Sequence, residues 1–138
     1  TAPEIHKQVI DLKQPWRAFV HGAGTGGTIE GVRRYLMRNN MKTKVCLTRP
    51  SESPHGIQGI GDGRDFLVNP ENVDRIINIG TDEAVERSKR FAKETGLLVG
   101  ISSGANILAA ERWVDTNQPR GIVVTMLCDR GERYMSIY

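Results

Sequence analysis

The stretch that decides the fold reads Ala18-Phe19-Val20-His21-Gly22-Ala23-Gly24-Thr25-Gly26-Gly27-Thr28. Its first four residues form a short apolar run typical of a strand, and residues 28–39 repeat apolar side chains at helical spacing, which predicts a helix. A glycine-rich loop between a strand and a helix turns several backbone N–H groups and the positive helix end toward an anion, and the missing Cβ atoms let that anion approach closely. The stretch therefore predicts a phosphate-binding loop, to which the hydroxyls of Thr25 and Thr28 can add donors. A tight turn without a ligand is the alternative.

The remainder of the chain continues the alternation of strands and helices. Apolar runs and helical spacing predict strands at 45–47, 75–79 and 122–127 and helices at 3–12, 81–95 and 104–114. This alternation implies an α/β fold with a layered, mostly parallel sheet and flanking helices. The run 122–127 is continuously apolar, which suits a strand buried on both faces. No linker or repeat divides the chain, so we expect residues 1–138 to form a single domain.

The helix at 81–95 carries its own sequence signals. Thr81 is expected to cap its N-terminus, because a hydroxyl there can accept a hydrogen bond from a free backbone N–H. Glu83 with Arg87, and Glu86 with Arg90, are four residues apart and are expected to form exposed ion pairs along the helix.

The composition is that of an ordinary globular protein, with 38% hydrophobic and 25% charged residues in a chain of 138. No apolar run approaches the roughly 20 residues of a membrane-spanning helix, so we expect no membrane contact. Nineteen basic residues against sixteen acidic ones give a net charge of +3, but the basic residues are spread out, and we expect no nucleic-acid partner. Cys46 and Cys128 lie in apolar runs and are expected to be buried, reduced thiols of a cytoplasmic protein.

The glycine loop also matches a second, weaker pattern. The spacing Gly22-x-Gly24-x-x-Gly27 is that of the dinucleotide-binding fingerprint. That fingerprint requires an acidic residue at the end of the next strand, roughly 20 residues on, to hold the ribose hydroxyls. Here this strand ends in Thr48-Arg49-Pro50, which disfavours NAD, while an arginine could accept the 2′-phosphate of NADP. A phosphate- or NADP-binding module without catalysis therefore stays open at this point.

Four segments together resemble the cysteine synthase and cystathionine β-synthase family. They are the glycine loop 19–28, His55-Gly56-Ile57-Gln58-Gly59-Ile60-Gly61, the stretch 96–105 with Gly100-Ile101-Ser102-Ser103-Gly104, and Cys128-Asp129-Arg130-Gly131-Glu132-Arg133-Tyr134-Met135-Ser136. The opening Thr1-Ala2-Pro3-Glu4-Ile5 is similar to the segment that precedes the loop in this family. The resemblance covers essentially the whole chain in order, and the set of motifs is specific.

The resemblance implies a cofactor, pyridoxal 5′-phosphate, and the large-domain portion of the tryptophan synthase β-like fold (type II pyridoxal-phosphate enzymes). It places the cofactor phosphate on Gly24, Thr25, Gly26, Gly27 and Thr28, the pyridine nitrogen on Ser102, and the amino-acid substrate beside Gln58 and Gly59. A hydroxyl partner leaves the pyridine nitrogen largely neutral, which suits β-elimination. From the residues alone, the N-cap of a helix at 104–114 is the favoured interpretation of Ser102. Cys128 is expected to pack rather than react, and no metal site is expected.

Three departures from the family pattern bear on function. The segment 49–55 is shorter than usual and Arg49 replaces the usual acid, which puts the accepted donor and nucleophile in doubt, and Asp62 stands where a small residue is common. The family's cofactor-binding lysine lies in a Ser-x-Lys-Asp-Arg motif, and its substrate-carboxylate loop reads Thr-Ser-Gly-Asn; neither occurs in this sequence. The lysines present are expected on the surface: Lys7, Lys13, Lys42, Lys44, Lys89 and Lys93.

We therefore expect this chain to be the C-terminal half of a cysteine synthase (O-acetylserine sulfhydrylase-like), without catalytic residues of its own. The resemblance implies β-replacement, in which sulfide takes the place of the leaving group of an activated serine to give cysteine. The isolated chain is expected to be inactive and to depend on a missing N-terminal segment or on a homodimer partner. Synthesis of cystathionine or diaminopropionate on the same scaffold is the alternative chemistry.

Overall fold

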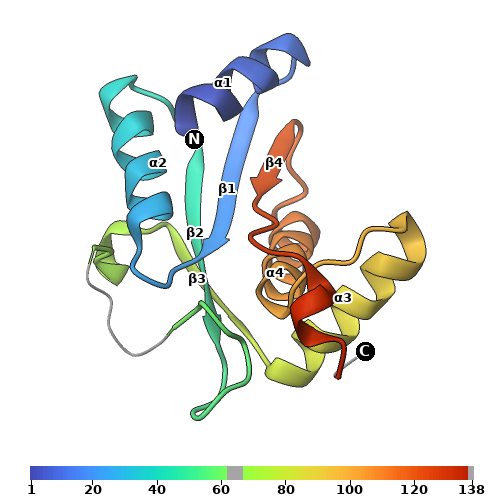
Figure 1. Cartoon of the computed structure of the whole chain (residues 1–138). Helices are drawn as coiled ribbons and strands as arrows, with labels where there is room; N and C mark the ends of the chain where they lie inside the picture. The colour runs from blue at the N-terminus through green and yellow to red at the C-terminus, as the bar shows by residue number, and fades with distance from the viewer. Residues whose placement is uncertain (62–66, 137–138) are drawn as a thin grey trace.

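The computed structural model describes residues 1–61 and 67–136 (Figure 1). In these residues the helices and strands follow one another as α1 (Ala2–Asp11), β1 (Trp16–Gly22), α2 (Gly27–Arg38), β2 (Lys44–Pro50), β3 (Arg75–Ile79), α3 (Thr81–Thr95), α4 (Ile101–Asn117) and β4 (Ile122–Thr125). Two short 3₁₀ helices, Pro70–Asn72 and Gly131–Tyr134, complete the described elements. Asp62 lies outside the described residues.

The strands form one parallel sheet in the order β3-β2-β1-β4. In its register Phe19 of β1 lies opposite Val45 of β2 on one side and Val124 of β4 on the other. Because all four strands run in the same direction, their carboxyl ends meet at one edge of the sheet, where ligands of open α/β folds bind. The predicted parallel α/β architecture is confirmed.

Helices cover both faces of the sheet, with α1 and α2 on one side and α3 and α4 on the other (Figure 1). Residues of β1 alternate between the two hydrophobic clusters: Ala18 and Val20 belong to the cluster that contains α4, and Phe19 belongs to the cluster that contains α2. All three are completely buried. Burying one such large side chain contributes about 1.5–3 kcal/mol, so this central strand holds both layers together.

The fourth strand is shorter and more exposed than its sequence predicts. β4 ends at Thr125 instead of residue 127, and its four residues are only half-buried. The reason is its place at the edge of the sheet, where β1 is its only strand neighbour among the described residues. Leu127 is 44% exposed, which contradicts the prediction of a strand covered on both faces.

Two local predictions are also corrected. The N-cap of α3 is Gly80, one residue before Thr81, whose hydroxyl instead accepts a hydrogen bond from the Gly56 N–H at 2.9 Å. Cys46 is buried as predicted, whereas Cys128 is exposed because it follows the end of the edge strand; both are free thiols. No helix in the described part of the chain combines the length and apolar composition needed to cross a membrane.

Candidate functional site

A cavity of about 320 Å³ opens at the carboxyl edge of the sheet and contains four of the predicted site residues. It is lined by His21, Gly22, Gly24, Gln58, Gly59, Ile60, Ser102, Cys128, Asp129, Arg133 and Tyr134. These residues come from the end of β1, the segment after β2, the first turn of α4 and the chain after β4. Gly24, Gln58, Gly59 and Ser102, predicted separately from motifs up to 78 residues apart in sequence (24 to 102), thus face one space.

The glycine loop leads into the first turn of α2. Gly26 is the N-cap of this helix and has a φ of 87°, a left-handed conformation that favours glycine. The first helix amide that reaches a carbonyl is that of Glu30, which donates to Gly26 O at 3.0 Å. Because the amides before it have no acceptor within the helix, the N–H groups of this first turn can bind an anion. The Thr25 hydroxyl lies 3.4 Å from the Gly27 N–H, and both residues are exposed.

The five predicted phosphate ligands do not all line the cavity. Gly24 lines it, whereas Gly27 and Thr28 line a separate hollow of about 430 Å³ between the N-terminus of α1 and the exposed side of α2. Thr25 and Gly26 lie between the two on the same loop. The assignment of a phosphate to residues 24–28 therefore stays a prediction, with Gly24 as the residue nearest to the remaining predicted ligands.

The segment 57–61 is fixed directly to the glycine loop. The Gly61 N–H donates to Ala23 O at 2.9 Å, and a Cβ on Gly24 would lie 2.8 Å from Gly59 O, closer than side chains tolerate. Ile57 and Ile60 are buried beneath this segment and anchor it, while Gln58 and Gly59 between them are exposed. Because Ile57 and Ile60 are buried on either side of them, the exposed Gln58 and Gly59 are left to line the cavity.

The two adjacent serines of α4 have different environments. The helix begins at Ile101 with Gly100 as its N-cap, so the alternative assignment of Ser102 as an N-cap is wrong. The Ser103 hydroxyl is fully buried and accepts a hydrogen bond from the Cys128 N–H at 3.1 Å. Ser102 is 6% exposed and lines the cavity, and its hydroxyl has no hydrogen-bond partner among the described residues. A hydroxyl that lines a cavity and has no partner in the described part of the chain is available to a ligand atom.

Asp129, Arg133 and Tyr134 also line the cavity and were not predicted as site residues from the sequence. Asp129 accepts a hydrogen bond from the Tyr134 hydroxyl at 2.8 Å through one carboxylate oxygen, and its other oxygen is buried without a partner. Burial and this carboxylate raise the pKa of Tyr134, so it remains a protonated donor. Desolvation and the same carboxylate raise the pKa of Cys128, which agrees with a thiol that does not act as a nucleophile. Cys128, Asp129 and Tyr134 all lie in the segment 128–136, whose resemblance to the family could have identified them as site residues.

The cavity lacks a lysine. All six lysines lie in the described part of the chain, and none lines it. No cluster of three or more His, Cys, Asp or Glu side chains that could hold a metal ion occurs within residues 1–61 and 67–136.

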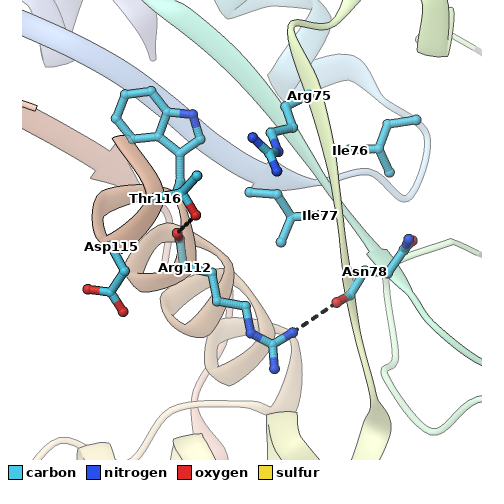
Figure 2. Close-up of a pocket in the computed structure, with 8 residues that line it drawn as sticks. Arg75, Ile76, Ile77, Asn78, Arg112, Asp115 and Thr116 are labelled. Carbon is cyan, nitrogen blue, oxygen red and sulfur yellow. Dashed lines mark hydrogen bonds between the residues drawn. The ribbon is translucent and has the colours of Figure 1, made fainter. Parts of the chain in front are cut away.

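A larger hollow of about 490 Å³ lies elsewhere, between β3 and α4 (Figure 2). Arg112 crosses it and donates to Asn78 O at 3.0 Å, as the dashed line in Figure 2 shows. It contains none of the predicted site residues, and it lies along the edge strand instead of at the strand ends. Size alone therefore does not identify the functional site.

Comparison with known proteins identifies the class of this chain. Residues 1–129 match the family described as pyridoxal-phosphate dependent enzyme, and the chain belongs to that family. The residues of the cavity fit such a cofactor, because the closely packed Gly24 and Gly59 and the Ser102 hydroxyl, which has no partner among the described residues, face one space.

Within this family, the chain is similar to proteins named cysteine synthase. A cysteine synthase of Staphylococcus aureus is 39% identical over 97% of this chain and 49% of its own length, and cysteine synthase B of Campylobacter jejuni is 39% identical over 99% of this chain and 47% of its own length. The chain thus spans about half the length of the curated relatives it matches.

Solved structures give the same result for the fold. The O-acetyl serine sulfhydrylase isoform 3 of Entamoeba histolytica matches with a TM-score of 0.87 at 34% identity, over 96% of this chain and 44% of that one. A hydrogen sulfide-producing enzyme of Fusobacterium nucleatum matches with a TM-score of 0.89 at 31% identity, over 98% and 43%. The predicted tryptophan synthase β-like fold is confirmed.

Proposed function

We propose that this chain is the C-terminal part of a cysteine synthase, which replaces the leaving group of an activated serine with sulfide in the cytoplasm. The observation that carries the proposal is that Gly24 of the glycine loop and Ser102 of α4 line the same cavity. The similarity to proteins named cysteine synthase, over nearly the whole chain, supports it. The non-catalytic NADP-binding alternative loses its support, because the family match accounts for the glycine loop.

The chain's contribution to this reaction would be to hold the cofactor. The backbone N–H groups and hydroxyls of residues 24–28 would bind the phosphate, since the positive end of α2 favours an anion there. The Ser102 hydroxyl would hydrogen-bond the pyridine nitrogen without a charge, so that this nitrogen stays largely neutral. Pyridoxal phosphate, when bound, supplies the electron sink that weakens bonds at the α-carbon of an amino acid.

The substrate would lie beside the segment 57–61. Gln58 is exposed on the cavity and has a donor and an acceptor to offer to a polar group of an amino acid. Gly59 has a φ of 82°, and no atom lies within 4 Å of the position where its Cβ would be, so its backbone borders open space in which a ligand fits.

We further propose that residues 1–138 form one domain, and that the reactive lysine and the substrate-carboxylate loop come from an N-terminal segment. Both hydrophobic clusters of the chain pack on one four-stranded sheet, which supports a single domain. A homodimer of the whole enzyme is proposed by analogy with the family.

The test uses this chain and the N-terminal half of a relative. Alone with pyridoxal phosphate and borohydride, the chain should become labelled on no single lysine, because none lines the cavity. Co-expressed with the N-terminal half of the Staphylococcus aureus cysteine synthase, it should copurify with cofactor and form cysteine from O-acetylserine and sulfide. Stoichiometric labelling of one lysine in the isolated chain would contradict the proposal.

A second chemistry on the same scaffold is supported by one comparison. An O-acetylserine dependent cystathionine β-synthase of Helicobacter pylori matches at 33% identity with a TM-score of 0.83, over 98% of this chain and 46% of that one. Supplying the assembled enzyme with sulfide or with homocysteine separates the two reactions. Faster turnover with homocysteine than with sulfide would identify cystathionine synthesis, and not cysteine synthesis, as the reaction of the assembled enzyme.

A further inference from the structure

The side chain of Asn106 joins three parts of the cavity wall. This asparagine of α4 is fully buried. Its Oδ1 accepts a hydrogen bond from the Gly22 N–H at 2.8 Å, and its Nδ2 lies 3.1 Å from Met126 O and 3.1 Å from Nδ1 of His21. One carboxamide therefore holds the end of β1, the chain after β4 and the imidazole of His21.

The neighbours of Asn106 fix the direction of its amide. A backbone N–H can only donate and a carbonyl oxygen can only accept, so the atom facing Gly22 must be oxygen and the atom facing Met126 must be nitrogen. The amide nitrogen has no lone pair to offer, so Nδ1 of His21 must accept a hydrogen bond from it. The proton of a neutral imidazole is then on Nε2.

The imidazole of His21 is held in place and stays uncharged. The residue is only 7% exposed, and the ring centroid of Phe19 lies 5.7 Å from its own. Desolvation lowers the pKa of His21 to about 4, so the ring is neutral near pH 7. The ring lines the cavity together with Gly24 and Ser102.

We propose that His21 is a ligand-binding residue of this cavity, whose Nε2–H donates a hydrogen bond to an oxygen of the bound molecule, and that Asn106 is the positioning residue that fixes its tautomer. The identity of the ligand rests on the proposed function. The oxygen is supplied either by a ring substituent of pyridoxal phosphate or by the carboxylate of the amino acid. A neutral donor recognises such an oxygen without placing a positive charge beside the pyridine ring.

His21 shares the cavity with titratable side chains of other types. The titratable or charged side chains that line the cavity with it are Cys128, Asp129, Arg133 and Tyr134. None of the other described lining residues carries an imidazole; His6 bonds the Tyr35 hydroxyl on the α1–α2 side, and His55 lies beside Gly61 O.

The first experiment measures the tautomer in the full 138-residue chain without a ligand, by long-range ¹H–¹⁵N NMR of the imidazoles. We expect His21 to carry its proton on Nε2 and to show no titration between pH 6 and 8. In Asn106→Asp the carboxylate can only accept, so the proton should move to Nδ1 and the pKa of His21 should rise. A proton on Nδ1 of the unsubstituted chain overturns the proposal, whether or not the variant folds.

The second experiment adds pyridoxal phosphate alone, or L-serine in its presence, and follows the same imidazole signals and the Kd. His21→Phe, which keeps a ring but loses the donor, should weaken binding of one of the two ligands about tenfold, and His21→Gln should recover most of it. His6→Phe is the matched control and should bind as the unsubstituted chain does.

The outcomes separate this proposal from the function proposed above. A titration that shifts the amides of the glycine loop but not the His21 signals overturns the ligand role of His21 and leaves the function standing. A titration that shifts neither, repeated on the chain co-expressed with the N-terminal half of the Staphylococcus aureus cysteine synthase, overturns both. Unchanged affinity of His21→Phe for both ligands also overturns the ligand role.

Discussion

At the scale of single residues, the pair Ser102 and Ser103 shows how one motif serves two purposes. The Ser103 hydroxyl accepts the Cys128 N–H inside the protein, whereas the Ser102 hydroxyl faces the cavity without a partner among the described residues. Adjacent positions in the first turn of a helix point in directions about 100° apart, which is why the two hydroxyls do not share a role.

Substitution of each serine should separate binding from stability. Ser102→Ala should weaken pyridoxal phosphate binding about fivefold to tenfold with little change in stability, because it removes one hydrogen bond to the ligand. Ser103→Ala should lower the free energy of unfolding by about 1–3 kcal/mol, because the Cys128 N–H loses its acceptor. Cofactor titration by fluorescence and urea unfolding measure the two effects. A loss of stability in Ser102→Ala without a loss of affinity would contradict this division.

The same substitution, glycine to alanine, should have opposite effects on stability at two positions. Gly24→Ala places a Cβ 2.8 Å from Gly59 O, so it should lower the unfolding free energy by about 1–3 kcal/mol and displace the cavity wall. Gly31→Ala, in α2, meets no atom within 4 Å and should raise stability by up to about 1 kcal/mol, because alanine favours a helix. Urea denaturation of both variants tests the pair, and equal effects of the same sign would refute the argument.

At the scale of elements, the N-terminus of α3 holds the chain that leads into the cavity. The Glu52 carboxylate accepts the Thr81 N–H at 2.6 Å, the Glu83 carboxylate accepts the Gly80 N–H at 3.0 Å, and the Thr81 hydroxyl accepts the Gly56 N–H at 2.9 Å. The segment 51–56 is therefore fastened to a helix end just before residues 57–61 enter the site. Negative charge at a helix N-terminus is favourable, which explains this use of two carboxylates.

This arrangement predicts a dependence on pH. Hydrogen bonds from Ser51 and Thr81 lower the pKa of Glu52 from its ordinary 4.5 to about 2, and the Gly80 N–H and Arg112 lower that of Glu83. A depressed pKa in the folded state means that the stabilisation is present above about 4.5 and is lost as the pH falls toward about 2. Urea midpoints measured from pH 5 to 3 should fall, and fall less in Glu52→Gln. Glu86→Gln, an exposed change in the same helix, is the control; an identical pH slope in all three proteins would exclude Glu52.

The pairing of α3 with α4 depends on Arg87, which the sequence pattern assigned to an exposed pair with Glu83. Arg87 is instead 7% exposed, and its guanidinium contacts Glu111 of α4 at 2.7 Å and Glu94 at 3.3 Å, while Glu83 pairs with Arg112. Arg87→Met should lower the unfolding free energy by about 1–3 kcal/mol. This loss is smaller than that expected for a fully buried ion pair, because Glu111 is 42% exposed and solvent screens the interaction. Chemical denaturation of the unsubstituted chain and of the variant, in low and high salt, measures this loss. Equal unfolding free energies of the two proteins would show that the pair is dispensable.

Most elements could be predicted from the sequence because apolar periodicity reports burial directly. The errors occur where tertiary position decides. β4 is an edge strand, so its apolar residues are half-buried and it ends early, and the N-cap of α4 is Gly100, whose N–H donates to Asp129 O of a distant segment at 3.1 Å. The partner of Arg87 could not be found from spacing, because helix–helix packing brings in a residue 24 positions away.

At the scale of the whole molecule, motifs predicted several residues that line the cavity but not the contacts between the segments that form it. Gly24, Gln58, Gly59 and Ser102 meet in one cavity, whereas the contact of His21 with Asn106 joins residues 85 positions apart and has no local signal. Such contacts depend on which strand ends meet α4, and one sequence does not encode that in any short pattern. The roles of the predicted ligands remain predictions that binding experiments decide.

The open edges of the sheet predict self-association. β3 and β4 are the outer strands in the described part of the chain, and Ile76 of β3 is 37% exposed beside the hollow in Figure 2. Exposed apolar edge strands favour pairing between chains, and a lysine on the edge opposes it. Ile76→Lys should lower the mass-average size in sedimentation with no loss of secondary structure. Thr116→Lys, across the same hollow on α4, is the control, and equal sedimentation of both variants would contradict the edge argument.

The hydrogen bond from Gly61 to Ala23 and the contact of Gly24 with Gly59 have a consequence for chimeric design. Two backbone segments that touch without intervening side chains constrain each other's shape, so they should be exchanged between homologues together. A crossover placed between residues 28 and 57 would combine loops of different parents and misfit them. Breakpoints before residue 18 or after residue 61 would keep the pair intact, and a recombination library should show survivors concentrated there.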